Sequence, residues 1–421
     1  MDTGLKTKRR YHILFFVLRK NRNDVAKDEN RIKKTRCSKW VRQSVVIAAI
    51  LLVVYAFVPN PHLFTNLPHK ISNYISITWN FTIPEVRHVG FLKVHKAGGS
   101  TIQNILFRFG IRRNVSFVMP VTQYKLSEFG KVPYDILNNK HGRNFDILTI
   151  HSVYNESVYA RLLPRDAARV AIVRDPLEVM VSGAYYHRDV WGVDYLRKVP
   201  NDNYIKNLIL FPEVYDKNEF SLTRNSMAMD FGFPKGLHCT ESDRVQHYLS
   251  YLNGNFDLVM ILERFDESLV LLKRLLRWTL KDILYIPQNT HHHPAISDLN
   301  LSSSDISKFQ LRNFLDVSLY NYFSNIFKSK VLAAGDDFKY EVEHMQSVVS
   351  KVTDYCVFHE RHSSSRDITV YQSDWNAEFT VNAEDCREMM TSELDFIDKI
   401  RKRVKSKLRG VYNKIFSFKS E

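Results

Sequence analysis

The sequence predicts an α/β fold with a central parallel sheet, because short apolar runs alternate along the chain with helical patterns. The runs at residues 89–94, 145–150, 170–173 and 258–262 have the length and composition of buried strands. Helical patterns follow two of these runs closely, and a strand followed by a helix, repeated, favours parallel pairing. No internal repeat or long low-complexity tract interrupts the alternation.

The helical patterns carry an apolar residue at every third or fourth position. Residues 100–109 place their apolar side chains on one face, and residues 265–278 place a row of leucines on one face. Near the C-terminus a basic amphipathic pattern predicts a packed terminal helix whose basic face is solvated. Its apolar stripe consists of Phe396, Ile400, Val404 and Leu408.

The positive charge of the chain is concentrated at its N-terminus. Residues 1–43 hold fourteen Lys or Arg against four acids, and so carry ten of the net fifteen positive charges. The small excess that remains elsewhere can be explained by an anion-binding site. The composition therefore does not indicate a nucleic-acid partner.

An uncharged apolar segment at residues 44–58 follows the basic block and predicts a single transmembrane helix. Because Lys and Arg crowd its N-terminal side, the positive-inside rule predicts a cytosolic tail at 1–43 and a luminal remainder. Short anchors suit the thinner membranes of the early secretory pathway. A cleaved signal peptide is the alternative, but the preceding region is too long and no Ala-x-Ala site follows.

Residues 59–88 are rich in Pro, Asn, His and Ser and predict a stem, which leads into a luminal domain at 89–421. The luminal assignment agrees with the glycosylation sequons, all of which follow the predicted anchor. They begin at Asn80, Asn114, Asn155 and Asn300.

Of the four cysteines, Cys239, Cys356 and Cys386 fall in the predicted oxidising lumen. Cys356 with Cys386 is the favoured bridge, on proximity in sequence alone. The third cysteine is then free or pairs between chains. A homodimer is among the arrangements that the sequence leaves open. No CxxC pair or HExxH motif points to a metal site, and the three histidines at 291–293 fit an exposed loop.

The most informative stretch joins the first predicted strand to the first predicted helix. Its turn contains Gly98 and Gly99 and opens onto Ser100 and Thr101, so backbone N–H groups and the positive helix end point at one spot. Such a turn can bind phosphate, although a tight strand-to-helix connection would also explain the glycines. The Walker A pattern does not occur in the chain, which disfavours an NTPase.

Lys96, at the start of this turn, strengthens the phosphate interpretation. A lysine there can reach the bridging oxygen of a bound phosphosulfate, where negative charge grows as the sulfuryl group leaves. Stabilising that charge in a dry site lowers the barrier by several kcal/mol, on the order of 3.

A second anion-binding element is predicted at residues 171–182. Arg174 ends a strand, a proline begins the following helix, and Ser182 lies eight residues beyond the arginine. Both side chains can face one anion, and a guanidinium offers phosphate a forked match. The alternative is that Arg174 pairs with Asp175 or with a helix end.

These two elements resemble the 5′-phosphosulfate and 3′-phosphate motifs of sulfotransferases that use 3′-phosphoadenosine-5′-phosphosulfate (PAPS). The longer strings are similar to the galactose-3-O-sulfotransferase family over residues 89–286. They read FLKVHKAGGSTIQNILFRFG, AIVRDPLEVMVSGAYYH, NSMAMDFGF and LVMILERFDESLVLLKRLLRW.

The resemblance implies a P-loop-like sulfotransferase fold in a Golgi type II membrane enzyme, with PAPS as donor, a β-galactoside acceptor and no required metal. By residue, it implies Lys93 and Lys96 at the sulfate, residues 98–101 around the 5′-phosphate, and Arg174 with Ser182 at the 3′-phosphate. Members often carry T-G-S-S-T in the turn. This chain instead has Ala97, Gly98, Gly99, Ser100 and Thr101, which removes one hydroxyl but keeps the backbone cradle.

Transfer to an alcohol needs a base for the hydroxyl proton, and histidine suits that role near neutral pH. His151 follows a predicted strand, so we expect it at the carboxyl edge of the sheet, where open α/β sheets bind ligands. His95 lies inside the turn, and the resemblance implies functional histidines at both positions. We favour His151 as base and His95 as a positioning residue, with Glu156 as a weaker substitute.

The sequence therefore predicts transfer of a sulfuryl group from PAPS to a galactose hydroxyl, with the 3-OH implied by the resemblance. A nucleotide kinase would share the cradle but should bring a Walker lysine and a metal-binding carboxylate. A non-catalytic luminal carbohydrate-binding protein would need no donor site. The acceptor could be a glycolipid or a glycan on a glycoprotein.

Overall fold

The computed structural model describes residues 84–122, 124–126, 136–137, 144–216, 221–287, 293–361 and 367–417. All of them belong to one compact unit, residues 68–421. The predicted tail, the anchor at 44–58, most of the stem and Asn80 lie outside the described residues. Within the described ranges, no helix has the length and apolar character needed to cross a bilayer.

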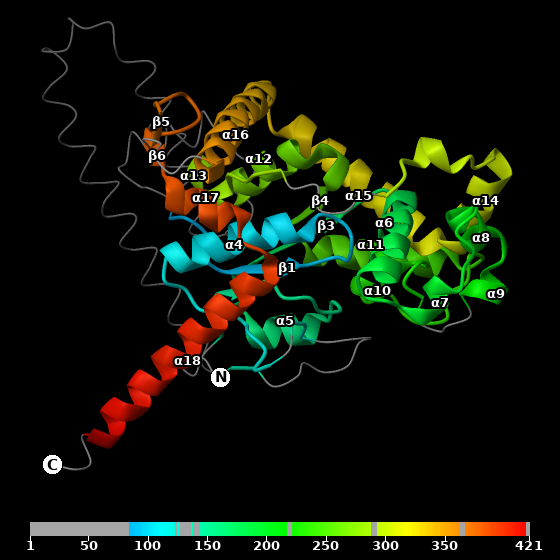
Figure 1. Ribbon diagram of the computed structural model, residues 1–421, viewed down its shortest axis with the longest axis horizontal. Coiled ribbons are helices and arrows are strands. Elements are labelled where there is room, and N and C mark those ends of the chain that lie inside the picture. The colour runs from blue at the N-terminus through cyan, green and yellow to red at the C-terminus, as the bar shows by residue number, and fades with distance from the viewer. Residues whose placement is uncertain are drawn as a thin grey trace, which may run out of the picture. The chain divides into compact units, whose positions relative to one another are not determined.

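The centre of the unit is a sheet of four parallel strands in the order β2-β1-β3-β4 (Figure 1). The predicted α/β class with a parallel sheet is confirmed. The strands span Val89–Leu92 (β1), Ile147–Leu148 (β2), Ala168–Val173 (β3) and Leu258–Ile261 (β4). From β1 the chain passes to β2 on one side and then crosses to β3 on the other side of β1. The direction of strand addition therefore reverses between β1 and β3, and open α/β sheets bind ligands at such a point.

Three strands are shorter than the apolar runs predicted, β4 by its last residue only. β1 ends at Leu92 because the chain turns away after Val94, with Lys96 in the left-handed region at φ 59°. β2 keeps only two residues of the predicted 145–150. Its ladder stops where Gln103 Nε2 donates to the carbonyl of Thr149 at 2.5 Å, so a side chain takes the place of a neighbouring strand.

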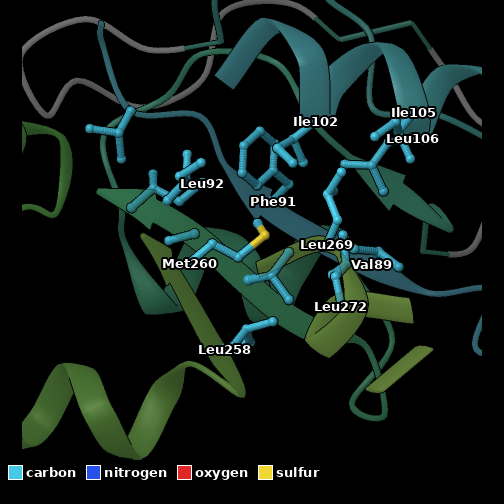
Figure 2. Close-up of a cluster of buried hydrophobic side chains, with 14 of the residues drawn as sticks. Val89, Phe91, Leu92, Ile102, Ile105, Leu106, Leu258, Met260, Leu269 and Leu272 are labelled. Carbon is cyan, nitrogen blue, oxygen red and sulfur yellow. The ribbon is translucent and has the colours of Figure 1, made fainter. Parts of the chain in front are cut away.

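Helices cover both faces of the sheet (Figure 1). α4 (Gly99–Arg112) and α12 (Phe265–Leu276) pack on the face that carries Val89 and Phe91, as the side chains in Figure 2 show. The opposite face of β1 lies against α5 (Glu156–Leu162), because a Cβ added at Gly90 would lie 2.6 Å from Leu163 and 3.2 Å from Tyr159. The core is thus a three-layer sandwich.

The other helices fall into two groups along the chain. Those between β2 and β4 are α5 (Glu156–Leu162), α6 (Pro176–Asp189), α7 (Asp194–Arg197), α8 (Tyr204–Leu210), α9 (Pro212–Tyr215), α10 (Ser226–Asp230) and α11 (Ser242–Asn255). Those after α12 are α13 (Leu280–Ile283), α14 (Ser303–Arg312), α15 (Phe314–Ala333), α16 (Phe338–Arg361), α17 (Ala383–Met390) and α18 (Glu393–Ser417). A small antiparallel hairpin, β5 (Ile368–Val370) with β6 (Phe379–Val381), separates α16 from α17.

The predicted helices are present with shifted ends. α4 begins one residue early, at Gly99, and α12 stops at Leu276 because Arg277 adopts a left-handed conformation. The predicted C-terminal helix is α18, whose Phe396 and Ile400 are fully buried. Val404 packs against the same core, and the side chain of Leu408 lies outside the described part.

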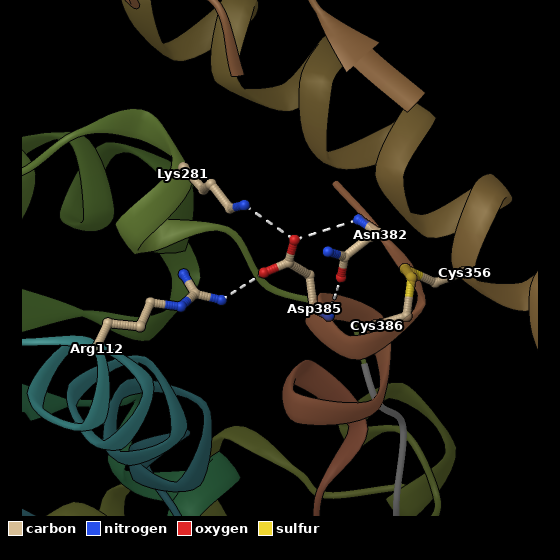
Figure 3. The surroundings of a disulfide bond; sticks show 6 residues. All are labelled: Arg112, Lys281, Cys356, Asn382, Asp385 and Cys386. Carbon is tan, nitrogen blue, oxygen red and sulfur yellow. Dashed lines mark hydrogen bonds and ion pairs between the residues drawn. A yellow bond between two sulfur atoms is a disulfide. The ribbon is translucent and has the colours of Figure 1, made fainter. Parts of the chain in front are cut away.

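A disulfide joins Cys356 of α16 to Cys386 of α17, the pair favoured from the sequence (Figure 3). Beside it, Asp385 accepts from Arg112 of α4 at 2.6 Å and pairs with Lys281 of α13 at 2.9 Å. Cys239, the remaining cysteine of the described residues, is free and exposed. The C-terminal segment is therefore held to the central unit by a covalent bond and by ion pairs.

Candidate active site

The turn between β1 and α4 lies at the carboxyl edge of the sheet. Gly98 adopts φ 75°, and a Cβ there would lie 2.6 Å from Leu262, so only glycine fits. Gly99 is equally restricted, since its Cβ would lie 2.9 Å from Lys93 Cγ. α4 therefore begins on bare backbone, with Ser100 exposed in its first turn and Ala97 fully buried beneath. Such an end favours an anion.

Arg174 connects the second predicted anion element to this turn. Its Nη1 donates to the carbonyl of Lys96 at 3.2 Å, across 78 positions of sequence, and its Nη2 pairs with Glu178 at 2.8 Å. The guanidinium therefore contacts the turn between β1 and α4. Its acidic partner is Glu178 rather than Asp175. Ser182, two turns along α6, is buried.

Lys96 lies between the turn and α6. Its ammonium sits 3.7 Å from the centre of the Tyr186 ring, a cation–π contact. Burial lowers the pKa of Lys96 to about 8, and the positive charges of Arg174 and Lys93 act in the same direction. Lys96 is therefore a cation at neutral pH that gains from the approach of negative charge.

Lys93, expected at the sulfate, is 2% exposed and already occupied. Its Nζ pairs with Glu393 of α18 and donates to Gln103 Oε1 at 2.9 Å. Ser100 Oγ donates to the same Glu393 carboxylate at 3.0 Å. Burial lowers the pKa of Lys93, although Glu393 acts in the opposite direction.

His95 is bound to an aspartate that the sequence analysis assigned no role. Asp230 of α10 accepts the backbone N–H of His95 at 2.7 Å and its Nδ1 at 2.9 Å. Burial disfavours the charged imidazole, but Asp230 outweighs burial and raises the pKa of His95 above the ordinary value. The His95 side chain is 40% exposed, so its other nitrogen can be reached by a substrate.

His151 stacks against His95, with ring centroids 4.2 Å apart. Its Nδ1 lies 3.0 Å from the carbonyl of Lys93, which fixes the proton on Nδ1 and leaves Nε2 as an acceptor. Burial, together with the positive charges of Lys93 and His95, lowers the pKa of His151 well below the ordinary value. The two predicted histidines therefore form one pair with opposite pKa shifts.

The short helix that carries Asp230 is stabilised by a second buried aspartate, Asp316. Asp316 of α15 accepts the backbone N–H groups of Met227 and Ala228, at 3.3 and 2.7 Å, and so caps the short helix that carries Asp230. Burial raises the pKa of Asp316 to about 7. Asp230 lies within the string NSMAMDFGF, whose likeness to the family was the one sequence signal that could have singled it out.

A cavity of about 500 Å³ opens beside the Arg174 element, at the carboxyl end of β4. Ile261, Arg264, Tyr320 and Phe327 line it together with Glu263. Glu263 also accepts the backbone N–H of Asp175 at 2.7 Å, which joins the cavity to the start of α6. The residues that line this cavity include neither the β1–α4 turn nor Arg174, so the cavity adjoins the start of α6 rather than the turn.

The remaining predicted residues lie away from the histidine pair or on the surface. Glu156 accepts from Tyr251 at 3.0 Å, and Thr101 is half-buried in the first turn of α4. The sequon residues Asn114, Asn155 and Asn300 are exposed. In the part of the chain that the structure describes, no three His, Cys, Asp or Glu side chains gather as a metal site would require.

Fold and site together define the class: a parallel α/β protein with a glycine turn at the carboxyl edge of its sheet, an arginine that follows the adjacent strand and a stacked histidine pair. The sequence matches the Galactose-3-O-sulfotransferase family over residues 24–376, further than the 89–286 expected. The chain therefore belongs to the galactose-3-O-sulfotransferase family.

Relatives with known names agree with this assignment. Galactosylceramide sulfotransferase of Homo sapiens is 31% identical over 261 residues, 59% of this chain and 59% of the relative. Galactose-3-O-sulfotransferase 2 of Mus musculus is 30% identical over 260 residues, 59% of this chain and 64% of the relative. Galactose-3-O-sulfotransferase 3 of Mus musculus is 32% identical over 272 residues, 60% of this chain and 59% of the relative. The matches thus span about three fifths of these relatives.

Proposed function

We propose that this protein transfers a sulfuryl group from PAPS to a hydroxyl of galactose, at the 3-position. The observation that carries the proposal is the bond from Arg174 to the carbonyl of Lys96, which unites the two predicted anion elements in one site. Membership of the family and the names of the relatives support the galactose acceptor.

In the proposed reaction the galactose oxygen attacks sulfur, and the bond between sulfur and the donor's bridging oxygen breaks. The electron pair goes to the departing adenosine 3′,5′-bisphosphate, whose charge Lys96 stabilises. Gly98, Gly99, Ser100 and Thr101 would hold the 5′-phosphate, and Arg174 with Ser182 the 3′-phosphate. Lys93 would meet the sulfate.

The hydroxyl proton passes to one histidine of the stacked pair. The sequence favoured His151, but the Asp230 contact, invisible in the sequence, supports His95 as the base. A base works best when its pKa lies near the working pH, and His95 is the member whose pKa is raised. His151 then supports the ring of His95 from one side.

We further propose a Golgi type II membrane protein, with a cytosolic tail at 1–43, an anchor at 44–58, a stem at 59–88 and a luminal domain at 89–421. The apolar segment and the basic block before it support this topology. A galactosyl glycolipid and a galactose-ending glycan on a glycoprotein are both acceptors of the proposed class.

The direct test is sulfate transfer from labelled PAPS by the full-length protein across galactosyl lipids and galactose-ending oligosaccharides. We expect incorporation that requires a galactose with a free 3-OH, and none into the 3-O-methyl acceptor. Binding to immobilised adenosine 3′,5′-bisphosphate is the accompanying measurement. A protein that binds sugars but not the bisphosphate would contradict the proposal.

A further inference from the structure

We call the residues proposed to hold the sulfate and the 5′-phosphate, Lys93 and residues 98–101, the donor cradle. The carboxylate of Glu393 contacts two side chains of this cradle. It pairs with the ammonium of Lys93 and accepts from the hydroxyl of Ser100 at 3.0 Å. Glu393 belongs to α18, beyond the residues that match the family. We propose that Glu393 is a residue of the donor site that occupies the place of the donor's 5′-anion and is displaced when the donor binds.

The contact follows from how the segment is anchored. Asn104 of α4 donates through Nδ2 to the carbonyls of Glu388, Met389 and Thr391, at 3.0, 3.3 and 3.3 Å, and so fixes the turn before α18. Arg112, two turns further along α4, pairs with Asp385 of α17 (Figure 3). The first residue of α18 is thereby delivered to the first turn of α4.

The chemistry of the three groups makes the exchange necessary. Lys93 is 2% exposed and Gln103 offers it only a neutral acceptor, so the charge of its ammonium is favoured by an anionic partner. A phosphate or sulfate oxygen offers it the same negative charge and the same hydrogen bond as a carboxylate. Two anions cannot accept from the same donors without strong repulsion, so the donor and Glu393 exclude each other.

The Glu393 side chain is 23% exposed, which gives it a route out. When the nucleotide leaves, the carboxylate returns and Lys93 is paired again. Because Ser100 is assigned to the 5′-phosphate, which the spent nucleotide keeps, Glu393 lowers the affinity for the donor and for the spent nucleotide alike and favours release after transfer. This inference rests on the proposed function, because it takes the cradle to be the donor site.

The test is calorimetric binding of adenosine 3′,5′-bisphosphate to full-length protein in detergent. Glu393→Gln should bind it roughly tenfold more tightly, since a charged competitor becomes a neutral one. The glutamine oxygen can still accept from Lys93, so the fold should be kept, and a thermal melt checks this. Glu393→Asp should also bind more tightly, because its charge remains while its reach is lost.

Two controls isolate the contact. Asp398→Asn makes the same change of charge one turn further along α18, where the side chain pairs with Arg401, and should leave binding unchanged. Adenosine 3′-monophosphate, which lacks the 5′-group, should bind wild type and Glu393→Gln equally.

The outcomes separate this inference from the proposed function. Unchanged or weaker bisphosphate binding by folded Glu393→Gln would overturn the role of Glu393 while leaving the donor site standing. An equal gain in Asp398→Asn, or with adenosine 3′-monophosphate, would also overturn it. Wild-type protein that binds no bisphosphate at all would instead refute the proposed function.

Discussion

Lys96 has a backbone conformation that few lysines adopt and a side chain that is held over an aromatic ring. If it stabilises the departing bisphosphate, Lys96→Ala should lower kcat about a hundredfold or more. Bisphosphate binding and the melting temperature should change little, because the interaction is made mainly in the transition state. Steady-state kinetics with labelled PAPS, beside calorimetric binding, measures both quantities.

The lowered pKa of Lys96 adds a pH signature to that variant. Wild-type kcat should fall as the pH rises through about 8, where the ammonium of Lys96 loses its proton. Lys96→Arg should retain some activity and lose this alkaline limb, since guanidinium stays charged. An alkaline limb that survives in Lys96→Arg would assign the limb to another group.

The dependence of activity on pH distinguishes the two stacked histidines as candidate bases. The two assignments place the acidic limb of the pH–rate profile at different pH values. If His95 is the base, activity should be lost as the pH falls through a value above the ordinary histidine pKa, because Asp230 raises the pKa of His95. Asp230→Asn should then move the limb to lower pH. If His151 is the base, the wild-type limb should lie well below the ordinary value, and His151→Ala should abolish it.

Arg174 is expected to read the 3′-phosphate. Arg174→Ala should weaken the binding of PAPS by roughly 1.5 to 3 kcal/mol, as expected for a lost hydrogen bond to a charged group. The binding of adenosine-5′-phosphosulfate, which lacks the 3′-phosphate, should weaken far less. Glu178→Gln is the matched control, because it breaks the ion pair of Arg174 but keeps the guanidinium. Equal losses for both donors would indicate that Arg174 acts only through its bond to the turn.

Among the elements, α12 and α16 are joined by one buried carboxylate. Glu341 is 2% exposed and accepts from Lys273 and Arg274, each at 2.6 Å. Glu341→Ala should lower the free energy of unfolding by about 3 to 5 kcal/mol, because Lys273 loses its ion pair in the interior and Arg274 keeps only the longer pair with Asp337 at 3.6 Å. Glu343→Ala, on the same helix, removes an exposed pair with Lys339 and should cost less than about 1 kcal/mol. Denaturant unfolding of both variants is the measurement.

Local patterns predicted the elements that local forces build. The strands were visible as apolar runs, and the turn was visible through Gly98 and Gly99, because those residues are required by the backbone at their own positions. Arg174 could be placed beside the turn because parallel strands bring their carboxyl ends to one edge.

The partners of these groups could not be predicted in the same way. Asp230 lies 135 positions from His95, and Glu393 lies 293 positions from Ser100. Asp230 is positioned by the cap that α15 provides to α10, and Glu393 is positioned by the attachment of α17 to α4. Neither contact produces a periodic pattern in the sequence. The sequence favoured His151 as base because it gives no sign of the contact between Asp230 and His95.

At the scale of the whole molecule, the exposed sequon residues Asn114, Asn155 and Asn300 bear on the proposed topology. If the domain is luminal, protease added to intact microsomes should spare everything after residue 58, and glycosidase treatment should increase the gel mobility of the protected fragment. Replacing the three asparagines by glutamine should remove the sites within the domain. Digestion of the domain in sealed microsomes would contradict the topology.

Glu393, which pairs with Lys93, follows both cysteines of the Cys356–Cys386 disulfide in the sequence. The β1 turn leaves the ribosome early, but the residue that pairs with Lys93 is translated 293 positions after Ser100. Until then Lys93 lacks the carboxylate that it contacts in the finished protein, and contacts between residues so distant in sequence form slowly. A nascent chain therefore carries Lys93 and the β1 turn before Glu393 has been made, and the Cys356–Cys386 bond can form only after residue 386 has been translated.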